Sequence, residues 1–433
     1  MAYPARDLLE SLYRSAVAAA HPAQCLPPHL PDFPSRGRLV VLAAGKAAGS
    51  MTEVAERHYL QQMAERDLAE DRLLGVAVTR HGYGRPTRRI EVVEAGHPVP
   101  DAAGLAGTER ALALADAAGA DDLVLVLLSG GASANWIAPA AGLTLAEKQA
   151  VTRALLKSGA NIGEINCVRK HLSRIKGGRL AQRADPAGVV TLAISDVPGD
   201  DPAVIGSGPT VPDPTTLADA RGLVAKYRLD LPEPVTQALA DPTNESPKPG
   251  ASLFAAARYT ILARPADGLR AAQARAEAAG YECIVLGDRL QGEARVVAAE
   301  HAKLARELSG QRVAILSGGE LTVTLRGQGR GGPNQEYALA LAIHLGGAKG
   351  ISGFAGDTDG TDGGSGRPDD PAGAFVDDTT LERAKSRGLD PAAFLADNDS
   401  TGFFNAIGDL FRPGPTFTNV TDFRAMVVDT PQV

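Results

Sequence analysis

Short apolar runs alternate with amphipathic segments along the chain, as in proteins built from strands and helices. In the first half, apolar runs predict strands at residues 38–44, 74–79, 90–94, 123–128 and 188–194. Helical patterns separate them, including residues 103–118 and 144–159, where Thr144 and Glu147 suit a capping box. Strands that alternate with helices at this spacing predict a doubly wound parallel sheet.

The second half repeats the α/β pattern after a segment rich in Pro, Asp and Asn at residues 229–250. Beyond this segment, the pattern predicts strands at 259–262 and 282–286 and helices at 268–279 and 293–308. We therefore predict two domains, residues 1–245 and residues 246–433, and expect the active site in the cleft between them.

The most distinctive stretch runs from Val313 to Glu336. It predicts a strand at 313–316, the turn Ser317-Gly318-Gly319, an alternating strand at 321–325 and a glycine-rich loop before a helix at 336–343. Glycines let successive N–H groups point into one concavity that suits an anion, and Arg330 adds a planar fork for phosphate or carboxylate. An ordinary strand-to-helix turn is the alternative.

The same tripeptide occurs upstream, where the predicted strand 123–128 enters Ser129, Gly130, Gly131, Ala132 and Ser133. The repetition indicates two anion-facing turns, one in each half of the chain. Lys46 follows the first strand at a glycine turn, on the sheet edge where ligands of open α/β sheets collect. A solvated lysine is the alternative interpretation.

A basic segment at residues 166–179 holds five Lys or Arg and no acid. Its apolar residues Val168, Leu172 and Ile175 suit one face of a helix. In a chain of net charge -7, Arg169, Lys170 and their neighbours provide a local positive field for an acidic ligand. The alternative is a solvated charged face.

Two groups of aspartates are candidates for binding a hard cation. Asp196 follows the strand 188–194, in the position where P-loop enzymes hold magnesium. Asp357 and Asp359 lie in a glycine-rich segment that does not fit an EF-hand loop but suits a magnesium ion shared with substrate phosphates. Local Asx turns are the alternative for each.

Composition excludes several classes of protein. With a net charge of -7 and a mean hydropathy of -0.08, neither a nucleic-acid partner nor a membrane span is favoured. The three cysteines are unclustered, which predicts no disulfide framework or zinc site and fits a cytoplasmic protein. The amphipathic N-terminus lacks the pattern of a signal peptide.

Together these features suit phosphoryl transfer, where charge neutralisation and positioning supply most of the catalysis. The sequence contains no Walker A motif and no protein-kinase signature, and no GxGxxG follows a strand with an acidic residue after the next strand. From the residues alone, the prediction is an enzyme that handles phosphate.

Seven blocks, in order, resemble the glycerate 2-kinase family, which joins a glycerate-kinase domain to a C-terminal MOFRL domain. The blocks are AAGKAAGSM, GHPVPD, LLSGGASAN, VRKHLSRIKGGRLA, SDVPGDDPAVIGSGPT, LSGGELTVTLRGQGRGGPNQE and GDTDGTDG. The resemblance implies a Rossmann-like N-terminal domain, a smaller C-terminal α/β domain, and transfer of the ATP γ-phosphate to the 2-hydroxyl of D-glycerate with Mg²⁺ or another divalent cation.

On this resemblance, we expect three catalytic residues: Lys46 neutralises phosphate charge, Asp196 orients the 2-hydroxyl, and Arg330 reaches glycerate or the phosphoryl group. Binding of substrate or phosphate is expected from residues of the turns and the basic segment, namely Ser129, Gly130, Gly131, Ala132, Ser133, Arg169, Lys170, Glu320 and Asn334. The expected metal ligands are Asp196, Asp357 and Asp359.

Two other classes stay open. Family members also carry the name hydroxypyruvate reductase, which would require NADH or NADPH, and a non-catalytic sensor of sugar acids or nucleotides would bind without turnover. We expect only small-molecule partners, D-glycerate and ATP, and leave formation of a homodimer open.

Overall fold

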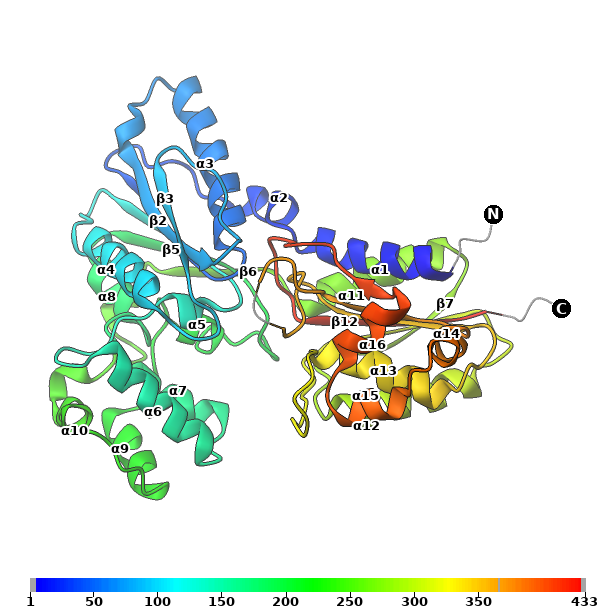
Figure 1. Cartoon of the computed structure of the whole chain (residues 1–433). Coiled ribbons are helices and arrows are strands. Elements are labelled where there is room, and N and C mark those ends of the chain that lie inside the picture. The colour runs from blue at the N-terminus through cyan, green and yellow to red at the C-terminus, as the bar shows by residue number, and fades with distance from the viewer. Residues whose placement is uncertain (1–4, 365–366, 430–433) are drawn as a thin grey trace. The chain divides into compact units, whose positions relative to one another are not determined.

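The computed structural model describes residues 5–364 and 367–429, and Figure 1 traces the chain. It divides into two compact units. The N-terminal unit is Cys25–Leu262, and the C-terminal unit combines residues 5–24 with 263–429. This division differs from the predicted domains, because the first helix packs with the second half of the chain and the second unit begins later than residue 246.

The N-terminal unit contains a six-stranded sheet in the order β3-β2-β1-β4-β5-β6, in which β1 to β5 pair in parallel. Its strands are β1 (Leu39–Ala44), β2 (Leu73–Arg80), β3 (Ile90–Ala95), β4 (Leu123–Leu128), β5 (Gly188–Ile194) and β6 (Arg258–Ala263). This is the doubly wound order of a Rossmann-like fold, as predicted. The prediction was wrong in assigning the strand at 259–262 to the second domain, since β6 completes the first sheet.

Helices of the N-terminal unit are α3 (Ala48–Glu65), α4 (Ala102–Asp116), α5 (Ala132–Asn135), α6 (Leu145–Lys157), α7 (Ile162–His171), α8 (Arg179–Ala184), α9 (Leu217–Lys226) and α10 (Glu233–Ala240). The described residues also form five short 3₁₀ helices: η1 (Pro27–His29), η2 (Glu70–Arg72), η3 (Ile205–Ser207), η4 (Pro242–Asn244) and η5 (Ser252–Phe254). The capping box predicted for the helix at 144–159 is confirmed on α6.

Helices cover both faces of this sheet. Alternate strand residues such as Val40, Leu42 and Val126 pack with Leu112 of α4 and Leu180 of α8 in one core, while α3 lies on the opposite face (Figure 1). Burial on both faces explains why these strands are continuously apolar.

A group of helices extends from the sheet, formed by α6, α7, α9 and α10 (Figure 1). Val151 and Leu155 of α6, Val168 of α7, Leu217 of α9 and Leu239 of α10 share its core. The basic segment predicted as one helix enters this group differently. Helix α7 ends at His171, and a turn carries the chain to α8, so the helical periodicity of residues 172–178 was misleading.

The C-terminal unit has a mixed six-stranded sheet in the order β11-β10-β9-β12-β8-β7. Only β7 and β8 pair in parallel, and the other neighbours are antiparallel. The strands are β7 (Glu282–Gly287), β8 (Val313–Gly319), β9 (Ile351–Asp357), β10 (Gly373–Val376), β11 (Leu410–Phe411) and β12 (Asp422–Val428). The predicted strand at 321–325 is wrong, since this segment forms only one isolated bridge, at Thr322.

Helices also cover both faces of the second sheet. They are α1 (Ala5–Ala19), α11 (Pro265–Ala278), α12 (Ala294–Glu307), α13 (Pro333–Leu345), α14 (Thr380–Ser386), α15 (Pro391–Ala396) and α16 (Ser400–Ile407), and a short α2 (Pro22–Cys25) follows α1. One face packs against α1 and α11, and the other against α12 and α13 (Figure 1).

Helix α1 joins the C-terminal unit through its apolar stripe. The Tyr13 ring packs edge-on against Phe354, Phe411 and Phe423, and its hydroxyl donates to the Asp357 carbonyl at 2.9 Å. Aromatic contacts of this kind bury much apolar area, which explains why α1 belongs to the C-terminal unit. None of the described helices is both long and apolar enough to span a membrane.

Candidate active site

The centre of the N-terminal sheet is a topological switch point, because the chain leaves β1 toward β2 and returns on its other side at β4. Ligands of open α/β sheets bind at the carboxyl ends of strands at such points. Here the loops after β1 and β4 touch: the Lys46 N–H donates to the Gly130 carbonyl at 2.7 Å, and the Ala47 N–H donates to Ser129 Oγ at 2.9 Å.

This contact requires a glycine before Lys46. Gly45 has φ 118°, and a Cβ at this position would lie 2.4 Å from Ser129 Oγ and 2.5 Å from the Ser129 carbonyl. The close approach of the two loops therefore fixes where the Lys46 backbone lies. The structure therefore brings Lys46 next to the first Ser-Gly-Gly turn.

Two consecutive amides of this turn lack a protein partner. Within residues 5–364 and 367–429, the N–H groups of Gly130 and Gly131 donate to no protein acceptor. Unpaired adjacent amides are rare in buried backbone, and a pair in a turn makes a concavity that suits an anion. Gly131 has φ 83°, in the region that favours glycine.

His97 and Lys46 flank Gly131. A Cβ on Gly131 would lie 3.0 Å from His97 Nε2 and 3.3 Å from Lys46 Cγ. The loop that carries His97 is held because Asn135 Nδ2 donates to the Gly96 carbonyl at 3.4 Å and the Gly96 N–H donates to Asp101 at 2.8 Å. His97 was not among the predicted site residues, although it lies in GHPVPD, one of the seven blocks.

Ser133 connects the turn to two other segments. Its hydroxyl lies 2.7 Å from the Ser207 hydroxyl, and its carbonyl accepts from Lys176 Nζ at 2.8 Å. Ala132 packs beside Gly206, whose φ is also positive. The structure thus brings together the Ser129–Ser133 turn, the loop at 205–208 and the basic segment.

The two basic residues that were expected to bind phosphate have different surroundings. Lys170 Nζ forms a buried 3.3 Å ion pair with Asp213, whose other oxygen accepts from Ser246. Its charge is already matched within the protein. Arg169 has no acidic partner in the described chain and lies near Lys148 and Lys176.

Lys148 and Lys176 are themselves unusual. Both side chains are buried, at 3% and 0% exposure. Burial, and then repulsion from nearby cations that include Arg169, holds the pKa of each lysine well below its usual range. These lysines lie in or beside the predicted basic segment and were not selected individually.

Asp196 follows β5, the neighbour of β4, and therefore lies at the same edge of the sheet as Ser129. Its side chain is half-buried. Nearby Asp201 has a local role, because its carboxylate accepts from the Ala203 N–H at 2.8 Å in a turn. Asp196 stays a candidate for the reaction.

In the C-terminal unit, the glycine-rich loop does not offer its amides to a ligand. The N–H groups of Arg326 and Gly327 donate to Asn398 Oδ1, and those of Gln328 and Arg330 donate to Asp397 and Asp399. The prediction that the amides of this loop bind an anionic ligand is therefore wrong, because these amides already donate to an acidic segment of the same unit.

The glycines allow that acidic segment to approach. A Cβ on Gly327 would lie 2.3 Å from the Asp397 carbonyl, and one on Gly329 would lie 2.3 Å from Asp399 Cβ. The result is a fixed loop from which the exposed Arg330 side chain projects, without an ion pair or hydrogen bond among the described residues. It lines a polar hollow of about 260 Å³ with Arg367, Arg412 and Asp370.

The second Ser-Gly-Gly is also not an anion-facing turn. It forms the end of β8, where the buried Arg424 side chain donates to the carbonyls of Gly318 and Gly319 at 2.5 and 3.1 Å. The carbonyls at this turn therefore face the cationic side chain of Arg424. The predicted pair of equivalent turns is therefore reduced to one. Glu320 follows this strand and is exposed.

Asn334 bridges two buried carboxylates. Its Nδ2 donates to Asp362 at 3.1 Å and to Asp422 at 2.7 Å. Burial and the adjacent Asp422 raise the pKa of Asp362 to about 7, and burial raises that of Asp422 as well. Gln335 donates to Asp362 too, so the cluster anchors the start of α13.

The predicted metal ligands do not form a ready-made cage. Asp357 and Asp359 accept hydrogen bonds in their own turn, Asp357 from the Asp359 N–H and Asp359 from Thr361. The part of the chain that the structure describes contains no group of three or more His, Cys, Asp or Glu side chains placed to hold a metal.

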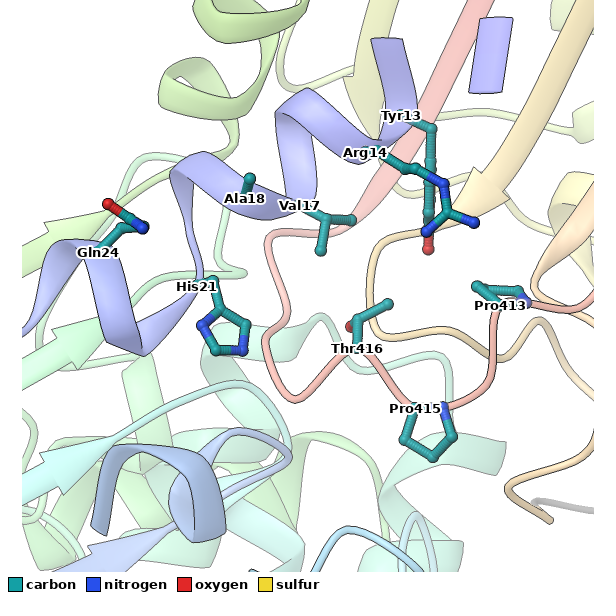
Figure 2. A pocket seen from close by; sticks show the side chains of 9 residues that line it. All are labelled: Tyr13, Arg14, Val17, Ala18, His21, Gln24, Pro413, Pro415 and Thr416. Carbon is teal, nitrogen blue, oxygen red and sulfur yellow. The ribbon is translucent and has the colours of Figure 1, made fainter. Parts of the chain in front are cut away.

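Another hollow lies beside α1 in the C-terminal unit, with a volume of about 340 Å³. Figure 2 shows His21 and Thr416 on its two sides. Arg14 at its edge pairs with Glu10. None of the predicted site residues lines it.

The fold and the site define a two-domain α/β protein whose first sheet carries, at its switch point, a turn with two amides that have no protein acceptor among the described residues. The family described as "Domain of unknown function (DUF4147)" matches residues 8–240, and the MOFRL family matches residues 313–422. Together these matches span both units.

Relatives extend over nearly the whole chain. A D-glycerate 2-kinase from Thermotoga maritima is 37% identical over 96% of this chain and 97% of its own. A protein from Agrobacterium vitis, named as a candidate hydroxypyruvate reductase, is 47% identical over 98% of this chain and 94% of its own. The crystal structure of glycerate kinase from Thermotoga maritima matches with a TM-score of 0.84 at 36% identity, covering 98% of this chain and 99% of that one. The chain belongs to the glycerate 2-kinase family.

Proposed function

We propose that this protein is an ATP-dependent glycerate 2-kinase, which transfers the γ-phosphoryl group of ATP to the 2-hydroxyl of D-glycerate. The observation that carries the proposal is the pair of unpartnered amides at Gly130 and Gly131 beside Lys46. Full-length relatives with glycerate kinase activity support the choice of substrates.

Each residue of the turn has a role in this proposal. The amides of Gly130 and Gly131 donate to phosphate oxygens, and Lys46 neutralises the charge that transfer places on them. Donors that are already held in place need no reorganisation during the reaction. The backbone hydrogen bond between Lys46 and Gly130 holds the two amides of this turn in place. His97, on the other side of Gly131, is a second candidate donor.

The acceptor side uses two further residues. Asp196 accepts a hydrogen bond from the 2-hydroxyl of glycerate and orients its oxygen for attack. Arg330 binds the glycerate carboxylate or the transferring phosphoryl group through its planar guanidinium. Its exposed position on a fixed loop supports such a role, and the predicted cleft between the domains stays a prediction.

A divalent cation accompanies ATP in this proposal and neutralises phosphate charge when bound. Mg²⁺ commonly keeps several waters and takes one or two carboxylates in addition to phosphate oxygens, so the lack of a three-residue cage among the described residues is compatible with it. Asp196, or Asp357 and Asp359, are the residues that would hold it.

Reductase activity is the second candidate, because the relative from Agrobacterium vitis carries that name. The turn after β1 argues against it. A dinucleotide site needs a glycine two residues after Gly45, where the backbone approaches the pyrophosphate, but this chain has Ala47, whose N–H donates to Ser129.

One pair of assays separates the candidates. ADP release is followed with ATP and D-glycerate, and absorbance of NADH or NADPH is followed with hydroxypyruvate. We expect ADP release that depends on glycerate, with 2-phosphoglycerate identified by NMR. Cofactor oxidation without ADP release would instead establish the reductase, and ligand binding with no turnover would establish a sensor.

We infer a cytoplasmic enzyme whose partners are the small molecules D-glycerate and ATP. A homodimer is open to test by the mass of the protein in solution. Neither the negative net charge nor the pI near 5.7 favours an anionic partner of large size.

A further inference from the structure

A cavity of about 310 Å³ lies within the N-terminal unit, next to the Ser129–Ser133 turn. Its walls come from the loop after β3, from α5 and the chain after it, and from α6 and α7. The lining residues that matter below are Val99, Ala134, Lys148, Thr152, Leu156 and Arg169.

The rim of the cavity is apolar and exposed. Val99 and Leu156 are 64% and 63% exposed, high values for large apolar side chains. Exposed apolar side chains gathered at a concave site indicate that a ligand covers them. A ligand for this cavity therefore has an apolar or aromatic part.

The inner side of the cavity is cationic. Lys148 Nζ donates to the Leu172 carbonyl at 2.6 Å and to the Arg169 carbonyl at 3.2 Å, and the Arg169 guanidinium lies close by. Lys176 is near enough to both for mutual repulsion. In the described residues, no carboxylate pairs with any of the three. Buried charges are normally paired, so this cluster indicates an anionic ligand.

The cationic cluster continues to the candidate active site. Lys176 donates to the Ser133 carbonyl, and the next residue, Ala134, lines the cavity. An extended anion can thus contact the cluster and the amides of Gly130 and Gly131 at once. Glycerate, a three-carbon acid with only polar groups, does not match a cavity with an apolar rim.

We propose that this cavity binds the purine and ribose of the nucleotide, with the phosphate chain passing Lys148, Arg169 and Lys176 toward the Gly130–Gly131 amides. The inference rests on the proposed kinase function and assigns the nucleotide to the N-terminal unit. A cavity of this size lies within the range of small-molecule sites. The aromatic base covers the apolar rim, and the phosphates neutralise the cluster.

The test uses two substitutions in the full-length protein. Thr152→Trp fills the cavity, and Leu156→Glu places a negative charge on its rim. Ile162→Glu is the matched control, because Ile162 is also 63% exposed but does not line the cavity. Binding of a non-hydrolysable ATP analogue is measured by calorimetry, together with KM for ATP and for D-glycerate. Circular dichroism checks the fold.

We expect Thr152→Trp and Leu156→Glu to weaken binding of the analogue and to raise KM for ATP by roughly tenfold or more, a loss of about 1.4 kcal/mol. In both variants, KM for glycerate should stay near the wild-type value. The control variant should keep wild-type binding of the analogue and wild-type KM values. If Thr152→Trp fails to fold, the exposed position of Leu156 keeps the test valid.

Unchanged nucleotide affinity in a folded Leu156→Glu variant would overturn the inference, and so would a rise in KM for glycerate alone. Failure of the proposed function is distinguishable. If the wild type releases no ADP with glycerate but binds the analogue, loss of that binding in the variants still supports the nucleotide site. If the wild type does not bind the analogue, the nucleotide site is refuted directly.

Discussion

The Lys46 N–H donates a 2.7 Å hydrogen bond to the Gly130 carbonyl, joining the loops that follow the two central strands of the first sheet. This bond turns the Gly130 carbonyl toward Lys46, and the amides of Gly130 and Gly131 have no protein acceptors in the described chain. A cationic residue and two fixed donors thus share one edge of the sheet.

Lys46→Ala is expected to lower kcat by on the order of 100- to 1000-fold, the usual loss when one well-placed charge stabiliser is removed. The hydrogen bond that fixes the turn uses the backbone of this residue, so we expect the variant to keep that bond and to fold. Steady-state kinetics and thermal melting measure both. The exposed Lys157→Ala serves as the control. A Lys46→Ala enzyme with near-normal turnover would remove Lys46 from the mechanism.

Gly131→Ala and Gly142→Ala form a matched pair for the turn. Both glycines have positive φ, 83° and 81°, so each substitution costs about 1–2 kcal/mol of stability from backbone strain. Only at Gly131 does the new Cβ meet a neighbour, 2.9 Å from His97, whereas nothing lies within 4 Å at Gly142. We expect activity to fall strongly in Gly131→Ala alone.

Equal activity in these two variants, measured under conditions where both are folded, would contradict the role of the turn. Denaturant unfolding supplies the folding control for each variant.

Arg330→Ala is expected to lower kcat or raise KM for glycerate without changing the melting temperature, since its guanidinium is exposed and forms no ion pair in the described chain. Arg326→Ala is the control, because Arg326 is exposed in the same loop and, among the described residues, forms a hydrogen bond through its backbone N–H alone. Loss of activity in both variants to the same degree would point to a general effect of loop charge.

We predict that the free energy of unfolding depends on pH through the titration of Asp362. Its pKa in the folded protein is about 7, above its ordinary value of 3.8, so the folded state holds this proton more tightly than the unfolded state does. The free energy of unfolding therefore falls as pH rises from about 4 to about 7, by at most about 1.4 kcal/mol per pH unit.

Asp362→Asn removes this titration, and we expect the slope of unfolding free energy against pH to be shallower in the variant between pH 5 and about 7. Urea unfolding at several pH values measures it. Loss of an acceptor for Asn334 and Gln335 will lower the variant's stability at every pH, which leaves the comparison of slopes intact. Identical slopes would show that Asp362 is ionised throughout.

Much of the fold is predictable because local signals and tertiary packing agree. The predicted strands at 123–128 and 188–194 coincide with β4 and β5, and the capping box at Thr144 starts α6 as expected. Continuous apolar runs of this length report burial on both faces of a parallel sheet. Lys46 and the first Ser-Gly-Gly turn were selected for the same reason, since both follow such strands.

Other features depend on residues distant in sequence. The tripeptide at Ser317 is identical to that at Ser129. At Ser317, however, the tripeptide ends a strand, and Arg424 on the neighbouring strand donates a hydrogen bond to its Gly318 carbonyl. The amides of the Arg330 loop are occupied by Asp397–Asp399, which no local pattern indicates. The role of glycine there is close approach, which the sequence alone does not separate from ligand binding.

The alternating pattern at 321–325 failed for a related reason. Leu325 is 80% exposed, and the segment has no neighbouring strand beyond the single bridge at Thr322. A period of two indicates a strand only where a sheet edge is available to pair with it. His97 was missed because its contact with Gly131 joins two loops that lie apart in the sequence.

The most direct test of the central claim is a crystal structure of the protein with a non-hydrolysable ATP analogue and D-glycerate. We predict a phosphate oxygen within about 3 Å of the Gly130 and Gly131 nitrogens, with the Lys46 ammonium beside it. Phosphates bound elsewhere, with those two amides still unpaired, would contradict it.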